Sequence, residues 1–499
     1  MQKKRIAGIL MPISSLPAPY GIGTIGKSGR RFIDWLADAG MKIWQILPLL
    51  PTGFGDSPYQ SCASNALNYY FIDFEELKKE GLLKRSDYAS IDWGDDPRAV
   101  DYGKIFQSRK SVLQKAFARF DKTSSEWQAF LKEGKYLDFA VFMSLKNAHG
   151  HRPWTEWGKY RKYSAEKIQA YIRSNLTEVE FWQFTQYIFL KQWFALKTYA
   201  NQKGVKIIGD MPIYVAFDSV EMWKYGKQLF YVDKRGLPTK RAGVPPDAFS
   251  DDGQLWGNPV YNWNQMKKDG YAWWNERINY ALTLFDYVRI DHFRAFDRYY
   301  AVDKDAVTAK EGRWYKGVGR DFFKDKRGVN IIAEDLGIID DSVRKLLKYT
   351  GYPGMRVLEF AFDGNRENSH KPSTFTSEDC IVYTGTHDNM PLTAYIRSLE
   401  GWQSSVFETD LKNECKIAGI VYRGRTAEEK CQTSVRLALA SKAFMAILPM
   451  QDVLNYGEES RLNAPSTLSM KNWSYRFLAS DFKKKTSKRL KALALRFGR

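Results

Sequence analysis

The sequence predicts an α/β fold, a (β/α)8 barrel with large helical and loop insertions between strands and no separate C-terminal β-domain. Eight short apolar runs recur along the 499 residues, and polar, Gly or Pro residues follow each run. Helical patterns lie between several runs, and 44% of the residues are hydrophobic, which suffices for a large core. Because periodicity does not fix strand pairing, a doubly wound open sheet remains an alternative.

The eight runs are short and carry apolar side chains on both faces, which is typical of strands buried on both sides of a parallel sheet. In chain order they lie at 5–13, 42–50, 205–208, 287–290, 329–333, 355–362, 380–384 and 443–448. Between the first two, residues 28–39 have the pattern of an amphipathic helix. Ser28 is expected to cap its beginning and Gly40 its end. A second amphipathic helix is expected over 341–349.

The uneven spacing of the runs locates the insertions. Residues 1–74 are expected to hold strands 1 and 2, and residues 75–200 a mainly helical insertion, because Lys, Glu, Leu, Trp and Phe recur there at helical spacing. Residues 201–499 are expected to hold strands 3–8. Within them, 216–286 has loop-like segments such as GVPPD and WGNP, and we expect a loop-rich insertion that covers the active site.

Charge and cysteine usage limit the partners. The net charge is +19, which attracts polyanions, so a non-catalytic polyanion binder is the alternative from a different class. No zinc-finger spacing, RNP-like strand or basic zipper is present, so no specific nucleic acid is expected. The densest basic run, 483–491, has the pattern of a solvated helix face. The four cysteines form no close pair, which favours a reducing, cytoplasmic location.

Several other sites are not expected. No stretch approaches the ~20 apolar residues of a membrane span, and the N-terminal apolar run is short and contains Pro12. His149 and His151 stand apart from other metal-binding residue types, so neither a metal nor a cofactor is expected. Gly21, Gly23 and Gly26 form GxGxxG, but seven residues separate them from Ile13, too many for a dinucleotide turn. The oligomeric state, monomer or dimer, stays open.

Acidic residues follow four of the predicted strands. They are Asp210, Asp291, Glu334 with Asp335, and Asp388. A single acid at a strand end is usually a helix cap. The carboxyl ends of barrel strands meet at one mouth, however, so several acids there point to carboxylate chemistry.

The types and spacing of these acids suggest separate roles. Arg289 lies two residues before Asp291, so both side chains point the same way, and the guanidinium would keep Asp291 ionised as a nucleophile. A structural Arg–Asp pair is the alternative. Glu334 follows an apolar run, where reduced solvation would raise its pKa toward acid/base duty. Two carboxyl groups about 5 Å apart act through a covalent glycosyl-enzyme and retain configuration.

Ten motifs together cover nearly the whole chain. They are LMPISSLPAPYGIG (10–23), GDSPYQS (55–61), GDMPIYVAFDS (209–219), GVPPDAFS (243–250), GQLWGNPVYNW (253–263), VRIDHFRAF (288–296), IIAEDLG (331–337), YTGTHDN (383–389), QDVLNYGEE (451–459) and LNAPST (462–467). With these motifs the chain resembles the 4-α-glucanotransferases called amylomaltases or disproportionating enzymes, relatives of the α-amylase barrel. The helical insertion matches less tightly.

The resemblance implies a retaining enzyme that moves α-1,4-glucan segments from a malto-oligosaccharide to the 4-OH of glucose or another malto-oligosaccharide. It implies Asp291 as nucleophile, Glu334 as acid/base and Asp388 as third essential carboxylate. It also implies sugar contacts from Ser57, Tyr59, Asp210, Trp256, Arg289, His387 and Asn463.

The resemblance further implies that GVPPDAFS is a loop over the acceptor site that excludes water. The same carboxylates would also serve an α-glucan hydrolase, which is the alternative within this class. Four positions depart from the usual family pattern, namely Phe54, Ala248, Glu359 and Met390.

Overall fold

A computed structural model describes residues 4–53, 55–246 and 251–499. Eight parallel strands form one sheet in the order β10-β11-β12-β1-β2-β3-β6-β9. Each of the eight apolar runs overlaps one of these strands, which confirms the predicted strand positions. The strands are β1 (Ile6–Leu10), β2 (Ile43–Gln45), β3 (Lys206–Met211), β6 (Tyr287–Ile290), β9 (Ile331–Ala333), β10 (Gly354–Val357), β11 (Cys380–Tyr383) and β12 (Met445–Pro449).

The two ends of this sheet meet. The backbone N–H of Ala333 in β9 donates to the carbonyl of Pro353, just before β10, at 3.0 Å. The backbone N–H of Met355 in β10 donates to the carboxylate of Asp335, just after β9, at 2.6 Å. The sheet is therefore closed into a (β/α)8 barrel, and the open-sheet alternative is wrong.

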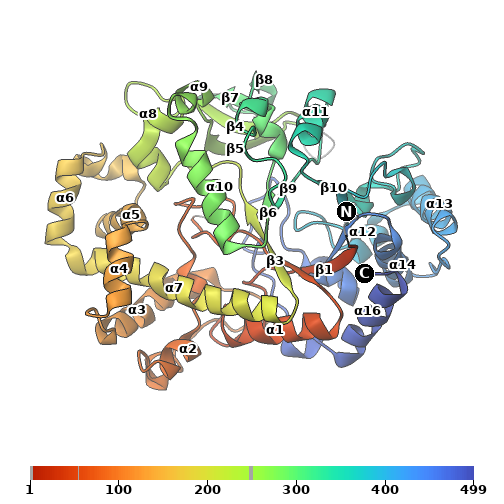
Figure 1. The fold of residues 1–499 in the computed structure, drawn as a ribbon, viewed down its shortest axis with the longest axis horizontal. Helices are drawn as coiled ribbons and strands as arrows, with labels where there is room; N and C mark the ends of the chain where they lie inside the picture. Colours follow the sequence, from red (N-terminus) through yellow and green to blue (C-terminus); the bar gives the residue numbers. More distant parts are fainter. Residues whose placement is uncertain (1–3, 54, 247–250) are drawn as a thin grey trace.

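The helices surround this barrel. Figure 1 shows α3–α7 together on one side of the strands and α12–α14 and α16 on the other. The α-helices are α1 (Lys27–Asp38), α2 (Phe74–Lys79), α3 (Tyr102–Arg119), α4 (Ser125–Glu133), α5 (Leu137–Ala148), α6 (Ala165–Ser174), α7 (Leu176–Gln202), α8 (Gly226–Leu229), α9 (Trp263–Met266), α10 (Ala272–Leu284), α11 (Asp341–Thr350), α12 (Leu392–Ser398), α13 (Gly401–Ile417), α14 (Ala427–Ala440), α15 (Met450–Leu454) and α16 (Lys484–Arg496).

The first helix begins one residue earlier than expected and has a different cap. Gly26 is its N-cap residue, without a side-chain hydrogen bond. Ser28 lies inside the helix, where its hydroxyl donates to the Thr24 carbonyl at 2.8 Å, so the prediction that Ser28 caps the helix is wrong. Gly40 follows the helix at φ +71°, a left-handed conformation that glycine adopts without strain, as predicted.

The interval 216–286 is more regular than the loop-rich insertion we expected. It contains a π-helical turn (Glu221–Tyr225), α8 to α10, and two strands, β4 (Lys240–Val244) and β5 (Gln254–Pro259). With β7 (Arg298–Asp303) and β8 (Arg313–Lys316) these strands form an antiparallel sheet in the order β5-β4-β7-β8. The strands are half-exposed and β4 pairs irregularly with β5 between Arg241 and Gly243, so their sequences lack a clear apolar alternation.

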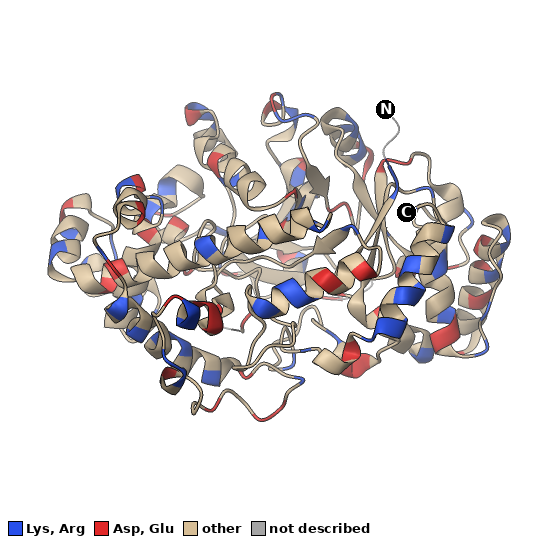
Figure 2. Ribbon diagram, turned by 60° about the horizontal axis from the view of Figure 1, so that its bottom comes forward, with Lys and Arg blue, Asp and Glu red and all other residues tan. Residues whose placement is uncertain are grey.

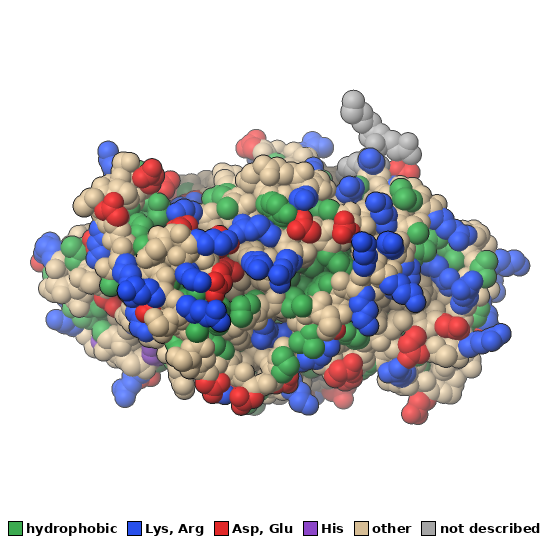
Figure 3. Space-filling view, turned by 90° about the horizontal axis from the view of Figure 1, so that it is seen from below, with side chains coloured by type: hydrophobic (Ala, Val, Ile, Leu, Met, Phe, Trp, Pro, Cys, Tyr) green, Lys and Arg blue, Asp and Glu red, His purple; other side chains and the backbone are tan. Residues whose placement is uncertain are grey.

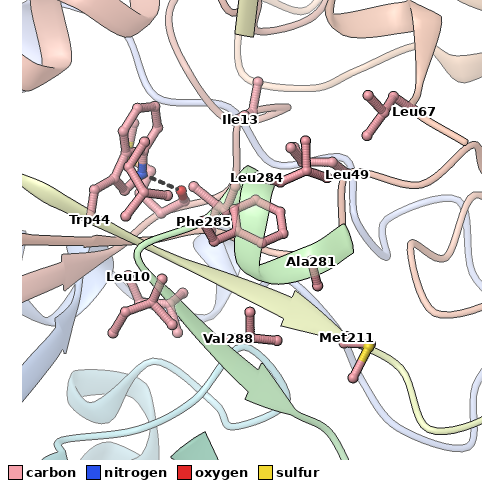
Figure 4. Close-up of a cluster of buried hydrophobic side chains, with 14 of the residues drawn as sticks. Leu10, Ile13, Trp44, Leu49, Leu67, Met211, Ala281, Leu284, Phe285 and Val288 are labelled. Carbon is pink, nitrogen blue, oxygen red and sulfur yellow. Dashed lines mark hydrogen bonds between the residues drawn. The ribbon is translucent and has the colours of Figure 1, made fainter. Parts of the chain in front are cut away.

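The core beside the site is tightly packed. Figure 4 shows Leu284 and Phe285, at the end of α10, among side chains from β3 and from the segment after β2. A Cβ atom on Gly209 of β3 would lie 2.1 Å from the Phe285 ring, so only glycine fits there. Trp44 donates its indole N–H to the Met11 carbonyl at 2.8 Å. The packing of Phe285 on Gly209 therefore fixes β3 directly before Asp210, and the Trp44 hydrogen bond joins β2 to the segment after β1.

Basic side chains occur on many helices and are not gathered in one patch. Figure 2 shows Lys and Arg on many helices, including α16, whose Leu490 and Ala494 are buried beneath its basic face. Figure 3 shows basic side chains spread over one face of the molecule with acidic and hydrophobic side chains between them. All four cysteines are buried and unpaired. Within the described ranges, no helix is long and apolar enough to cross a membrane.

Candidate active site

The strand register brings the predicted acids together. Asp210 of β3 lies opposite Arg289 of β6, and Ile290 of β6 lies opposite Ala333 of β9. Asp291 and Glu334 directly follow these last two residues, so they stand side by side at the carboxyl ends of neighbouring strands. The backbone N–H of Glu334 donates to the Ile290 carbonyl at 3.0 Å, which holds this alignment past the ends of the strands.

Arg289 connects two of the acids. Its Nη1 lies 2.8 and 2.7 Å from the two carboxylate oxygens of Asp210. Its Nη2 lies 2.8 Å from Oδ1 of Asp291. The Asp210 carboxylate also accepts a hydrogen bond from the Tyr59 hydroxyl at 2.7 Å. The Arg289 side chain is only 4% exposed, so these charges attract one another in an environment that screens them little.

Asp291 is the accessible member of this network, because its side chain retains 28% exposure. Desolvation raises its pKa, the Arg289 guanidinium and His387 oppose the rise, and the charges of Asp210 and Asp388 add to it, so the net direction is upward. The ion pair with Arg289 favours the ionised form. The result is a carboxylate that is held in one orientation and is open to a ligand on one side.

Glu334 has the surroundings of a proton donor. Burial, followed by the negative charge of Asp291, raises its pKa to about 7, and Arg289 opposes that rise. The backbone N–H groups of His292 and Leu336 donate to its two oxygens at 2.7 and 2.6 Å. Because Arg289 pairs directly with Asp291 and not with Glu334, we assign the proton of this pair to Glu334 near neutral pH.

A second group of predicted residues lies beside the first. Asp388 accepts a hydrogen bond from the Asn463 amide at 2.7 Å, and its other oxygen lies 3.4 Å from Nε2 of His387. The His387 ring stacks on Tyr59 with ring centroids 5.1 Å apart. Tyr59 therefore links this group to Asp210. The Asp388 side chain is 47% exposed and accessible to a ligand.

The last two predicted contacts are more peripheral. Trp256 in β5 packs edge-on against His292 at 4.9 Å between ring centroids, and the backbone of His292 holds Glu334. The Ser57 hydroxyl accepts from the Tyr59 backbone N–H at 3.3 Å. Trp256 therefore contacts a residue that binds Glu334, whereas Ser57 is connected to the acids only through Tyr59.

Sequence reasoning missed two contributors. His292 adopts a left-handed conformation at φ +47°, uncommon for a residue other than glycine, and in this conformation its N–H donates to Glu334. Burial lowers the pKa of its imidazole to about 3, so His292 adds no positive charge beside the acids. Trp473, also left-handed at φ +65°, packs on the rings of Tyr59 and His387. His292 directly follows Asp291 in the motif DHF, and this position could have identified it. No sequence pattern pointed to Trp473.

The positions that depart from the family pattern divide into two groups. Phe54 and Ala248 lie outside the described residues. Glu359 is buried and binds the segment that carries Asp388, and Met390 lies half-buried in that same segment. In the part of the chain that the structure describes, no three His, Cys, Asp or Glu side chains are grouped to hold a metal ion.

These features together support one class of chemistry. A carboxylate that is paired with an arginine stands next to a carboxyl group whose pKa burial raises to about 7. In a retaining displacement at an acetal carbon, the first group bonds to the carbon and the second supplies and removes a proton. A third acid with a histidine and an amide beside it offers hydrogen-bond partners for hydroxyl groups.

Comparisons with known proteins agree with this chemistry. A family model described as 4-alpha-glucanotransferase matches residues 11–480. The 4-alpha-glucanotransferase of Clostridium butyricum is 42% identical, with 98% of this chain and 100% of the relative covered. That of Thermus thermophilus is 40% identical, with 99% of each chain covered.

Solved structures agree at the level of the fold. An amylomaltase from Streptococcus agalactiae in complex with acarbose is similar, with a TM-score of 0.93, 39% identity and coverage of 99% of this chain and 100% of that one. An amylomaltase from Corynebacterium glutamicum has a TM-score of 0.77 at 17% identity, covers 99% of this chain and 75% of its own, and supports the fold alone.

Proposed function

The chain belongs to the 4-alpha-glucanotransferase family, and from this premise we propose which of its residues transfer the glucan and how. As a member it is a glycosyltransferase that transfers segments of α-1,4-glucan. The proposed donors are malto-oligosaccharides, and the proposed acceptors are glucose or another malto-oligosaccharide. The relative solved with acarbose supports an oligosaccharide ligand. A place in maltose and glycogen or starch metabolism follows from these substrates.

In the first step, Asp291 is the nucleophile and Glu334 the acid. An oxygen of Asp291 forms a bond to the anomeric carbon of the donor while the bond from that carbon to the glycosidic oxygen breaks. Glu334 gives its proton to this oxygen, so the leaving segment departs with a new 4-OH. The ion pair with Arg289 keeps Asp291 ionised, and burial keeps Glu334 protonated.

In the second step, Glu334 acts as a base and the proton moves in the opposite direction. Glu334, now ionised, takes the proton from the 4-OH of the acceptor, and the acceptor oxygen attacks the same anomeric carbon. The bond to Asp291 breaks, and both carboxyl groups return to their starting protonation states. Two inversions at one carbon retain its α configuration.

Asp388, His387 and Asn463 are proposed to bind hydroxyl groups of the sugar that reacts. The hydrogen bond from Asn463 and the nearby His387 ring orient the Asp388 carboxylate. A charge-assisted hydrogen bond to a sugar hydroxyl that strengthens as the ring distorts would lower the barrier of the first step. Tyr59 and Asp210 hold Arg289 and His387 in place and are proposed sugar contacts, as are Ser57 and Trp256.

Transfer instead of hydrolysis requires that water stays away from the glycosyl-enzyme. We assign this role to the segment GVPPDAFS at 243–250, which begins at the end of β4 in the small sheet before Trp256. A closed cover lets an acceptor hydroxyl intercept the intermediate. A cytoplasmic location is part of the same proposal, and the four buried, unpaired cysteines support it.

The observation that carries the proposal is the contact of Arg289 with both Asp210 and Asp291, next to a Glu334 whose pKa is near neutrality. Its test is a maltotriose digest analysed by thin-layer chromatography. The protein should form glucose and chains longer than maltotriose, and Asp291→Ala should form neither while its circular dichroism stays unchanged. Products that are only shorter than maltotriose would favour the hydrolase, and an active Asp291→Ala variant would refute the nucleophile.

A further inference from the structure

Two buried acids hold the segment 384–392, which carries His387 and Asp388. Asp452, in α15 after β12, accepts hydrogen bonds from the Thr384 hydroxyl at 2.5 Å and from the Leu392 backbone N–H at 2.8 Å. Glu359, in the 3₁₀ turn η10 (Leu358–Phe360) after β10, accepts from the Asn389 amide at 2.8 Å. The segment is thus anchored from the ends of both strands that flank β11.

The contact of Glu359 continues toward Asp388. The side-chain oxygen of Asn389 accepts from the backbone N–H and the hydroxyl of Thr386 at 2.8 and 2.7 Å. The Thr386 hydroxyl in turn lies 3.3 Å from the backbone N–H of Asp388. Two side chains, Asn389 and Thr386, therefore separate Glu359 from the backbone of the third carboxylate.

Glu359 lies close against the segment and is not fully satisfied. It is 8% exposed, and its Oε2 has no hydrogen-bond partner among the described residues. A Cβ atom on Gly385 would lie 3.6 Å from this oxygen and 3.9 Å from Oδ2 of Asp452. Both acids therefore face the backbone of Gly385. Among the described residues, Glu359 forms no direct ion pair with a Lys or Arg side chain.

The charged and titratable groups around Glu359 come from three elements. Asp452 of α15 raises its pKa, Arg461 after η12 (Glu458–Ser460) lowers it, and Tyr395 of α12 lies near enough for its own pKa to be raised by Glu359. Burial is the largest influence and raises the pKa of Glu359 to about 8. Glu359 is therefore mostly a neutral acid at pH 7.

Arg461 connects this pocket to the proposed sugar-binding group. Its guanidinium donates to the Asn463 carbonyl at 2.8 Å and lies 3.4 Å from the Asp388 carbonyl. Arg461 is partly exposed and also lies 3.4 Å from Glu458. A negative charge on Glu359 would attract its guanidinium away from the two carbonyls, because Glu359 is buried and water screens only part of this attraction. The ionisation of Glu359 would then shift the backbone of Asp388.

We propose that Glu359 is a positioning residue that sets the place of Asp388 through Asn389 and Thr386, and that it does so in its neutral form. The inference rests on the proposed function, since it takes Asp388 as a carboxylate that contacts the sugar. Glu359 itself touches neither substrate nor the reacting atoms. A glutamine supplies the same acceptor and never ionises, whereas a leucine removes the acceptor.

The experiment compares Glu359→Gln, Glu359→Leu and a matched control, Glu414→Leu. Glu414 is also a buried glutamate that holds a turn, since it accepts from the Ser373 N–H and hydroxyl at 2.9 and 2.5 Å. Glu359→Leu should lower kcat for maltotriose about 10- to 100-fold with KM changed less than 3-fold, because small displacements of a site group are costly. Glu359→Gln should keep kcat within about 3-fold, and Glu414→Leu should lower Tm without lowering kcat.

Two further readouts separate positioning from stability alone. Asn389→Ala should lower kcat as Glu359→Leu does, and the double variant should be no worse than either, because both remove one contact. Above pH 8 the logarithm of kcat/KM should fall by about two per pH unit in the wild type, where Glu334 and Glu359 both lose protons, and by about one in Glu359→Gln.

Each part of the proposal has a result that would overturn it. A Glu359→Leu variant with wild-type kcat, or loss of kcat in Glu414→Leu equal to that in Glu359→Leu, would overturn the positioning role. Equal alkaline slopes in wild type and Glu359→Gln would overturn the role of the neutral form. Asp388→Asn serves as the separate arm for the proposed function, because an active Asp388→Asn variant would refute the role of Asp388 whatever the Glu359 variants do.

Discussion

Replacing Arg289 by leucine tests the electrostatic basis of the site. The substitution removes the partner of two carboxylates, Asp210 at 2.7 Å and Asp291 at 2.8 Å, and leaves Asp210 fully buried. Breaking a buried ion pair from one side costs about 3–5 kcal/mol. If half of this free-energy cost is borne by Asp291, its ionised form is destabilised by about 2 kcal/mol, which raises its pKa by about 1.5.

The direction of the effect follows from the roles of the two acids. The nucleophile must be ionised, so activity is lost as the pH falls through the pKa of Asp291. The acid must be protonated, so activity is lost as the pH rises through the pKa of Glu334, which is about 7. Arg289→Leu should therefore shift the acidic limb of kcat/KM for maltotriose upward by about 1–2 pH units and lower the maximum.

The assay is glucose release from maltotriose between pH 4 and 9, with Tm measured at each pH. Without Arg289 the folded-state pKa of Asp291, which burial already raises, should lie still further above its unfolded value, so the variant should be destabilised most at high pH and regain stability as the pH falls. Arg98→Leu is the matched control, since Arg98 pairs with buried Asp481 at 2.8 and 3.0 Å away from the strand-end acids. A folded Arg289→Leu variant with an unmoved acidic limb would refute the reasoning.

Three further substitutions have defined outcomes. Glu334→Gln should lose transfer from maltotriose but keep part of its glycosylation rate with a glycosyl fluoride, whose leaving group needs little protonation; equal losses with both donors would contradict the acid role. Asp388→Asn should lower kcat about 100-fold or more with an unchanged Tm, and wild-type kcat would remove Asp388 from the site. Gly209→Ala should lower the free energy of unfolding by about 1–3 kcal/mol in urea titration, because its Cβ would overlap the Phe285 ring, and an unchanged midpoint would show that the ring moves freely.

The sequence was most informative where local rules govern structure. The eight barrel strands are short apolar runs that end at polar residues, so their positions followed from burial on both faces. The spacing of Arg289 and Asp291 predicted their contact, which the ion pair at 2.8 Å confirms. The apolar run before Glu334 predicted reduced solvation, and the raised pKa of this group has that cause.

The parts that the sequence did not reveal depend on tertiary contacts or on the backbone. Glu334 is held by the N–H groups of His292 and Leu336, which every residue type except proline can supply. Trp473 reaches Tyr59 from more than 400 residues away in the chain, so no local pattern connects them. The strands β4 and β5 were not predicted because they are half-exposed and irregularly paired.

The central claim is that Asp291 forms the bond to the transferred sugar. The direct measurement is intact-protein and peptide mass spectrometry of Glu334→Gln after incubation with a maltosyl fluoride whose non-reducing 4-hydroxyl has been removed, so that the donor cannot act as acceptor. Glu334→Gln lacks the base for the second step, so the adduct should accumulate. We expect one glycosyl unit on the peptide that contains Asp291 and none after Asp291→Ala, whereas a label on Asp210 or Asp388 would contradict the account.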